Sequence, residues 1–93
     1  MIKTFADKRT AALFSGRFVK ALPADVVVRA KRKLDPIDSA ASLDFLRVPP
    51  GNRLETLQGD RRGQHSIRVN DQWRVCFRWI DGHVYDVEFC DYQ

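Results

Sequence analysis

The sequence predicts one α+β domain, in which helices from the first half of the chain cover one face of a small antiparallel sheet from the second half. Ninety-three residues allow a single hydrophobic core, and 44% hydrophobic with 30% charged residues is an ordinary globular composition. Apolar residues recur at helical spacing early in the chain, whereas they alternate with polar residues later. We therefore expect residues 1–93 to form a single domain.

The first elements are short. Residues 2–5 are a β candidate, and residues 7–15 are predicted to form a helix with Leu13 and Phe14 facing inward. Gly16 provides the stop signal of this helix, because glycine accepts the backbone conformation found after a helix end.

A longer helix is predicted to begin at Pro23, since proline is tolerated in the first turn. Pro36 should kink or end this helix. Residues 42–46 predict a further helical turn, and the Pro-Pro-Gly-Asn segment at 49–52 closes the helical half. The long helix has one apolar stripe at spacings of four, four and three residues, formed by Val26, Ala30, Leu34 and Ile37.

The second half is predicted to form strands. Residues 53–57 are a strand candidate, and residues 64–69, 73–79 and 85–90 alternate between apolar and polar side chains. Three neighbouring alternating strands predict an antiparallel meander with one apolar and one polar face. The expected apolar face consists of His65, Ile67, Val69, Trp73, Val75, Phe77, Trp79, Tyr85, Val87 and Phe89.

The hydrophobic pattern also predicts the strand register, because a slip of one residue would move every side chain to the opposite face. The loop around residues 70–72 must hold an odd number of residues, which places Arg68 opposite Arg74. Arg68, Arg74 and Arg78 then converge on the polar face, where either acids of the last strand or a bound phosphate would offset their repulsion.

The second hairpin contains a conflict. Its burial pattern sets Asp86 near Arg78. Asp81-Gly82 is the usual signal of a two-residue turn, and such a turn would point the side chains of the last strand to the opposite faces of the sheet. We give the burial pattern more weight, and a β-bulge would reconcile the two observations.

The charge distribution leaves two interpretations open. The net charge of +4 and a pI near 9.4 suit an anionic partner such as nucleic acid, but they also suit simple solubility. Arg29, Arg32 and Lys33 share one face of the long helix, which is either solvated or binds RNA or a protein partner.

Two features bear on the compartment. The sequence has no apolar run long enough to span a membrane, and charge follows the N-terminus too soon for a signal peptide. Cys76 and Cys90 form no CxxC motif and have no set of nearby histidines, which argues against zinc and against a disulfide framework. We therefore expect a cytoplasmic protein without a metal site.

Three segments carry a resemblance to a known family. They are residues 49–55 (PPGNRLE), residues 63–77 (GQHSIRVNDQWRVCF) and the terminal residues 87–92 (VEFCDY). The chain resembles a HigB-type toxin of the RelE/ParE superfamily, which belongs to bacterial type II toxin–antitoxin systems. The resemblance covers essentially the whole chain and is strongest over residues 49–77.

This resemblance implies a RelE-like fold and a ribosome-dependent endoribonuclease, or mRNA interferase, which stops translation by cutting mRNA without a metal ion or cofactor. The open basic face of the sheet would bind the RNA. The implied partners are the ribosome with its mRNA, a HigA-type helix-turn-helix antitoxin and, through the antitoxin, operator DNA. No membrane is implied.

The resemblance also implies site residues. Arg74 matches the arginine of the family's active site, and Asp91 and Tyr92 match its acidic and aromatic ending. The chain departs from the pattern at two positions. Relatives commonly have histidine where this chain has Gln93, and some have histidine where it has Glu55. Glutamine can only hydrogen-bond, so acid–base chemistry would fall to Glu55, Asp91 and Tyr92.

Five further arginines are expected to hold RNA phosphates. The strand alternation predicts a core or semi-buried position for His65. Two other functions remain open. In the first, the chain does not cut but occupies RNA, the ribosome, or only antitoxin and DNA, and Gln93 favours this function. In the second, the chain inhibits DNA gyrase, and residues 49–77 argue against it. The phosphate-binding arginines are Arg53, Arg61, Arg62, Arg68 and Arg78.

Overall fold

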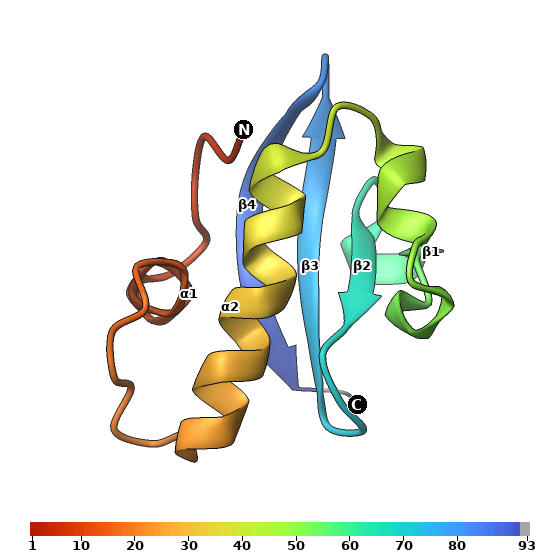
Figure 1. Cartoon of the computed structure of the whole chain (residues 1–93). Helices are drawn as coiled ribbons and strands as arrows, with labels where there is room; N and C mark the ends of the chain where they lie inside the picture. Colours follow the sequence, from red (N-terminus) through yellow and green to blue (C-terminus); the bar gives the residue numbers. More distant parts are fainter. Residues whose placement is uncertain (92–93) are drawn as a thin grey trace.

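The computed structural model describes residues 1–91 and has the expected α+β architecture (Figure 1). An antiparallel sheet in the order β1-β2-β3-β4 lies behind the helices. Within residues 1–91, no helix is long and apolar enough to cross a membrane. The strands are β1 (Glu55–Thr56), β2 (His65–Arg68), β3 (Trp73–Ile80) and β4 (His83–Asp91); the helices are α1 (Lys8–Phe14) and α2 (Ala24–Ser39), and the 3-10 turns are η1 (Leu43–Arg47), η2 (Pro50–Asn52) and η3 (Gly59–Arg61).

The N-terminal segment covers the outer edge of β4. Ile2 and Phe5 make isolated parallel bridges to Val84 and Val87, so the β candidate at residues 2–5 is not a continuous strand. α1 follows directly, with the Asp7 carboxylate accepting a 2.7 Å hydrogen bond from the backbone N–H of Thr10. This cap explains why the helix begins where the sequence predicts it.

α2 contains the predicted apolar stripe, whose four residues are all buried. The helix does not end at Pro36, one of the two outcomes expected, but continues to Ser39. Pro36 lies in the last turn, where it removes a single backbone donor, and the burial of Ile37 holds that turn against the sheet. The predicted turn at residues 42–46 is confirmed as η1.

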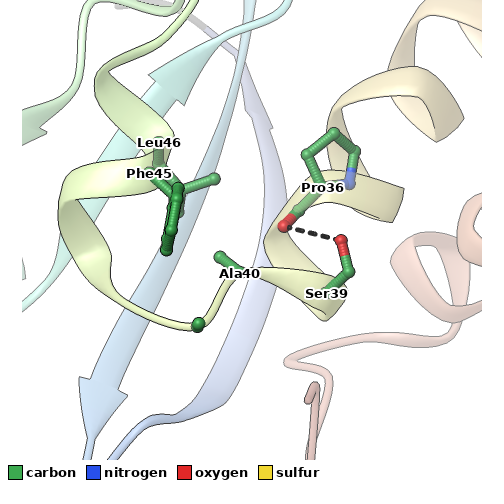
Figure 2. Close-up of a pocket in the computed structure, with 6 residues that line it drawn as sticks. Pro36, Ser39, Ala40, Phe45 and Leu46 are labelled. Atoms are coloured by element: carbon green, nitrogen blue, oxygen red, sulfur yellow. Dashed lines mark hydrogen bonds between the residues drawn. The ribbon is translucent and has the colours of Figure 1, made fainter.

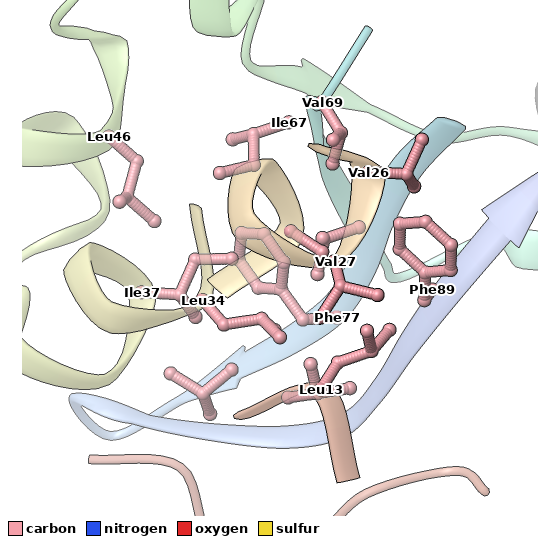
Figure 3. Packing of buried hydrophobic residues seen from close by; sticks show 14 of the residues in the cluster. Leu13, Val26, Val27, Leu34, Ile37, Leu46, Ile67, Val69, Phe77 and Phe89 are labelled. Atoms are coloured by element: carbon pink, nitrogen blue, oxygen red, sulfur yellow. The ribbon is translucent and has the colours of Figure 1, made fainter. Parts of the chain in front are cut away.

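The core lies between α2, α1 and the apolar face of the sheet (Figure 3). Ile67, Val75 and Phe77 are fully buried in it, as the alternation predicts, and His65, Trp73 and Trp79 lie at its margin. The cluster shown in the figure includes Leu13, Val26, Val27, Leu34, Ile37, Leu46, Ile67, Val69, Phe77 and Phe89.

The register of the first long hairpin is confirmed, with Arg68 directly opposite Arg74. β1 is shorter than predicted for residues 53–57. Arg53 has a left-handed backbone with φ of 47° because it ends η2, and this conformation cannot continue a strand.

Both signals of the second hairpin prove correct. Asp81 and Gly82 have positive φ angles of 51° and 80° and form a two-residue turn, while β4 contains a bulge at Asp86, whose φ is 55°. The bulge shifts the parity, so Val84 and not Tyr85 is buried beside Val87. The prediction that Tyr85 lies on the apolar face is therefore wrong.

Candidate active site

A pocket of about 390 Å³ opens on the polar side of the sheet, opposite the helices. The strand alternation that buries Val75 and Phe77 under α2 directs Arg74 to the other side. The pocket is lined by Glu55, Leu57, Arg61, Ser66, Arg74, Cys76, Cys90 and Asp91. Three of the five predicted catalytic residues, Glu55, Arg74 and Asp91, therefore meet in one place, while Tyr92 and Gln93 lie outside the described residues.

Arg74 forms the floor of the pocket and is only 6% exposed. Its Nε donates a 2.8 Å hydrogen bond to the hydroxyl of Ser66, and its Nη2 donates to the carbonyl oxygen of Arg53 at 2.9 Å. A longer bond of 3.3 Å joins Nη2 to the Ser66 carbonyl. These contacts fix the plane of the guanidinium, because its donors have a rigid geometry.

Arg74 forms an ion pair with Glu55, whose Oε1 lies 3.7 Å from Nη1. Two acids of the last strand pair with arginines other than Arg74. Glu88 pairs with Arg61 and Asp86 pairs with Arg78. The Glu55 side chain is 53% exposed, so the pair combines a buried cation with an accessible anion at the mouth of the pocket.

Arg61 brings a second cation to the same pocket. Its Nη1 donates hydrogen bonds to Glu88 at 3.0 Å and to Gln64 at 3.1 Å. The hydrogen bond to Glu88 raises the pKa of Arg61, against the opposing effect of burial. Arg61 is therefore a fixed positive charge in the pocket wall.

The other predicted phosphate-binding arginines do not line this pocket. Arg53 contributes only its carbonyl oxygen, to Arg74, and its side chain is exposed like that of Arg62. Arg68 pairs with Asp71, and Arg78 donates through Nε to Asp86 at 3.2 Å. Arg68 and Arg78 share the polar face with Arg74 as predicted, but carboxylates already offset their charge.

Two further predictions concern groups away from the pocket. His65 is half-buried beside Phe77, with ring centroids 6.0 Å apart, and burial lowers its pKa. Lys33 does not lie in a fully solvated face of α2, because its ammonium donates to the side chain of Asn52. Arg29 and Arg32 are exposed.

Sequence reasoning missed four lining residues, Leu57, Ser66, Cys76 and Cys90. Three of them were detectable, because Ser66 and Cys76 alternate with the apolar residues of their strands and are cross-strand partners, and Cys90 is the partner of Arg74. Among residues 1–91 no group of three or more His, Cys, Asp or Glu side chains is arranged so that it could hold a metal ion.

A second pocket of about 270 Å³ lies between the end of α2 and η1 (Figure 2). It is lined by Pro36, Ser39, Ala40, Ala41, Phe45 and Leu46, none of which has an acidic or basic side chain. This hollow therefore offers no titratable side chain, unlike the pocket around Arg74.

Residues 3–93 match the family described as the RelE-like toxin of the type II toxin–antitoxin system HigB. This chain belongs to the HigB-like toxin family. The chain is 36% identical to the Endoribonuclease HigB of Proteus vulgaris over 93 residues, which are 100% of this chain and 100% of that protein. It is 44% identical to Toxin HigB-1 of Vibrio cholerae over 63 residues, which are 68% of this chain and 66% of that toxin.

Solved structures show that the fold of this chain is of the RelE, YoeB and YafQ type. The YoeB-YefM complex from Staphylococcus aureus contains a chain that superposes with a TM-score of 0.62 at 17% identity, covering 100% of this chain and 98% of that one. YafQ from E. coli strain BL21(DE3) superposes with a TM-score of 0.65 at 13% identity, covering 98% and 91%. The partner of a type II toxin is an antitoxin, so this chain forms a toxin–antitoxin complex.

Proposed function

We propose that the pocket of Glu55, Arg74 and Asp91 is where this chain cuts RNA. Family membership and full-length similarity to an endoribonuclease make the chain a HigB-type endoribonuclease toxin of a type II toxin–antitoxin system. The observation that carries the assignment to this pocket is the orientation of Arg74, a buried guanidinium held beside an accessible carboxylate.

The proposed reaction is the attack of a ribose 2′-hydroxyl on the neighbouring phosphate. Arg74 stabilises the negative charge that develops on the phosphate oxygens, because its preorganised donors need no reorientation during the reaction. Glu55 accepts the proton of the 2′-hydroxyl, and Tyr92 returns a proton to the leaving 5′-oxygen. Since side chains perform each step, the proposed cleavage is independent of metal ions.

Asp91 and Gln93 flank Tyr92 in the chain, and we assign them positions against the reacting ribose and phosphate. Asp91 lines the pocket at the end of β4. Gln93 contributes hydrogen bonds only, because an amide neither takes up nor releases a proton near neutral pH. The resemblance of the C-terminal segment to HigB-type toxins supports these roles.

The proposed substrate is mRNA bound to the ribosome, held by phosphate contacts from arginines around the pocket. Arg61 is part of the pocket wall, and Arg53 and Arg62 are exposed beside the first strands. Arg68 and Arg78 would exchange their carboxylate partners for phosphates, which is electrostatically feasible because arginine binds both groups through the same planar fork.

The proposed protein partner is a HigA-type helix-turn-helix antitoxin, through which the complex contacts operator DNA. The family description supports an antitoxin partner, and the HigB resemblance supports its type.

The test uses purified protein, ribosomes and a defined mRNA, with cuts mapped by primer extension. We expect cuts in ribosome-bound mRNA with the natural chain, and loss of cutting with Arg74→Lys, which keeps the charge but not the fork. Gln93→His should cut faster, because histidine restores a group that exchanges protons near neutral pH. Stable ribosome binding without any cut would contradict the proposal and leave an RNA- or ribosome-binding module.

A further inference from the structure

Cys76 and Cys90 lie together in the wall of the RNA pocket. In the register of β3 and β4, Cys76 pairs with Glu88 and Arg74 pairs with Cys90, so the cysteines are diagonal neighbours across the two strands. The Cys90 thiol donates a 3.4 Å hydrogen bond to the carbonyl oxygen of Glu88, and the two thiols interact closely enough to shift the pKa of each other. Both cysteines are unpaired thiols, and both face the pocket.

The surroundings give the two sulfurs different properties. The interaction with Cys90 and the positive charges of Arg61 and Arg74 lower the pKa of Cys76, against the effect of its burial. The interaction with Cys76 and burial raise the pKa of Cys90. Cys76 is therefore the more readily deprotonated of the two, and the thiolate is the reactive form of a cysteine.

We propose that Cys76 and Cys90 are an oxidant-modified thiol pair, which hydroperoxides convert to an intramolecular disulfide that stops RNA cleavage. The loss of cleavage rests on the function proposed above, whereas formation of the disulfide does not. The pairing of two thiols in one pocket carries the inference, because a disulfide needs a second sulfur within reach.

The chemistry proceeds in two balanced steps. The Cys76 thiolate forms a bond to the outer oxygen of the hydroperoxide, and the O–O bond breaks. Cys76 becomes a sulfenic acid, and the rest of the hydroperoxide takes up the proton that Cys76 had lost and leaves as an alcohol or water. The Cys90 sulfur then attacks the Cys76 sulfur and releases water, with the Cys90 proton leaving in that water. The two thiols lose two electrons together, and the hydroperoxide gains them.

The disulfide would change the shape of the pocket. Diagonal neighbours in an antiparallel pair lie roughly 7–8 Å apart, and a disulfide usually spans at most about 6.8 Å between Cα atoms. Closing the bond therefore draws the end of β4 toward β3. Asp91 follows Cys90 in the chain and Arg74 is the cross-strand partner of Cys90, so this movement displaces both groups from their places in the pocket.

The first measurement counts free thiols in the purified full-length chain. Hydrogen peroxide treatment is followed by denaturation, maleimide labelling and intact-mass analysis. We expect two adducts on the reduced chain, none on the oxidised chain, and two again after dithiothreitol. Cys76→Ser and Cys90→Ser each lack a partner thiol and serve as matched controls. Retention of both adducts after peroxide, or disulfides only between two chains, would overturn the proposal.

The second measurement applies the same samples to ribosome-bound mRNA. We expect the oxidised chain to lose cutting and to regain it with dithiothreitol, while each serine variant, compared with its own untreated sample, keeps its activity in peroxide. Undiminished cutting by fully oxidised protein would refute the coupling. If the reduced chain never cuts, the proposed nuclease function is refuted, and so is the proposed loss of cutting on oxidation. The number of maleimide adducts would still show whether the disulfide forms.

Discussion

Replacing Arg74 with alanine should lower the free energy of unfolding by about 3 kcal/mol, in addition to its effect on RNA cleavage. The guanidinium donates to the Ser66 hydroxyl at 2.8 Å and to the Arg53 carbonyl at 2.9 Å, and Ser66 is fully buried. Each buried acceptor left without its donor costs roughly 1–3 kcal/mol. Two such acceptors give about 2–6 kcal/mol, and we expect the lower part of this range because the bond to the Arg53 carbonyl is only partly buried.

The assay is urea unfolding followed by the fluorescence of the two tryptophans, Trp73 and Trp79. Arg78→Ala is the matched control on the same strand, since its ion pair with Asp86 joins side chains that are 38% and 54% exposed. An exposed pair of this kind is worth about 1 kcal/mol or less. Equal losses for Arg74→Ala and Arg78→Ala would refute the view that Arg74 organises the pocket.

Three further predictions test other parts of the structure. Gly63→Ala should lower the stability by about 1–2 kcal/mol in thermal unfolding, because Gly63 has a φ of 90° and the added Cβ would lie 2.9 Å from an Arg78 nitrogen. Gly51→Ala is the control and should be nearly neutral, because its added Cβ meets no atom within 4 Å. Equal effects of the two substitutions would contradict this reasoning. Burial lowers the pKa of His65 below 6.5, so the unfolded chain takes up that proton first as the pH falls. The contribution of His65 to stability is therefore present above about pH 6.5 and is lost as the pH falls toward the folded pKa. Urea unfolding of His65→Gln at several pH values should lack this part of the pH dependence. If the free energy of unfolding changes with pH as it does in the natural chain, His65 is not its source. Glu55→Gln should slow single-turnover cutting by roughly 10²–10⁴-fold, the usual contribution of a general base, and an unchanged rate would assign proton removal to another group.

The helices and the first long hairpin could be predicted because one periodic pattern determines each of them. The stripe of α2 places Leu34 in the core, and the alternation of β2 and β3 fixes Arg68 opposite Arg74. A one-residue slip would bury charge, so the burial pattern alone selects this register. Where one physical requirement dominates, the sequence is sufficient.

The second hairpin shows where such reasoning fails. The turn at Asp81-Gly82 and the burial of Val87 require opposite parities, and the chain satisfies both through the bulge at Asp86. The sequence allowed a bulge but could not place it, because any residue of β4 with an exposed side chain could accommodate the extra residue. Tyr85 was therefore assigned to the wrong face.

The candidate site was predictable in its members but not in its pairings. Glu55, Arg74 and Asp91 meet in the pocket, as the resemblance to the family implies. The partner of Arg74 could not be found from strand alternation, since Glu55 reaches it from the edge strand β1 across Ser66. Pairing among several arginines and carboxylates depends on side-chain reach, which spacing along one strand does not determine.

The central claim, that the pocket around Arg74 cuts mRNA on the ribosome, is tested most directly by mapping mRNA 5′ ends in bacteria that express the chain without its antitoxin. We predict new 5′ ends at in-frame positions of coding regions with the natural chain. These ends should persist with Arg47→Lys, whose pair with Asp44 is exposed and does not line the pocket, and disappear with Arg74→Lys at equal protein level. Growth arrest without new 5′ ends, or equal cutting by Arg74→Lys, would contradict the assignment of the nuclease to this pocket.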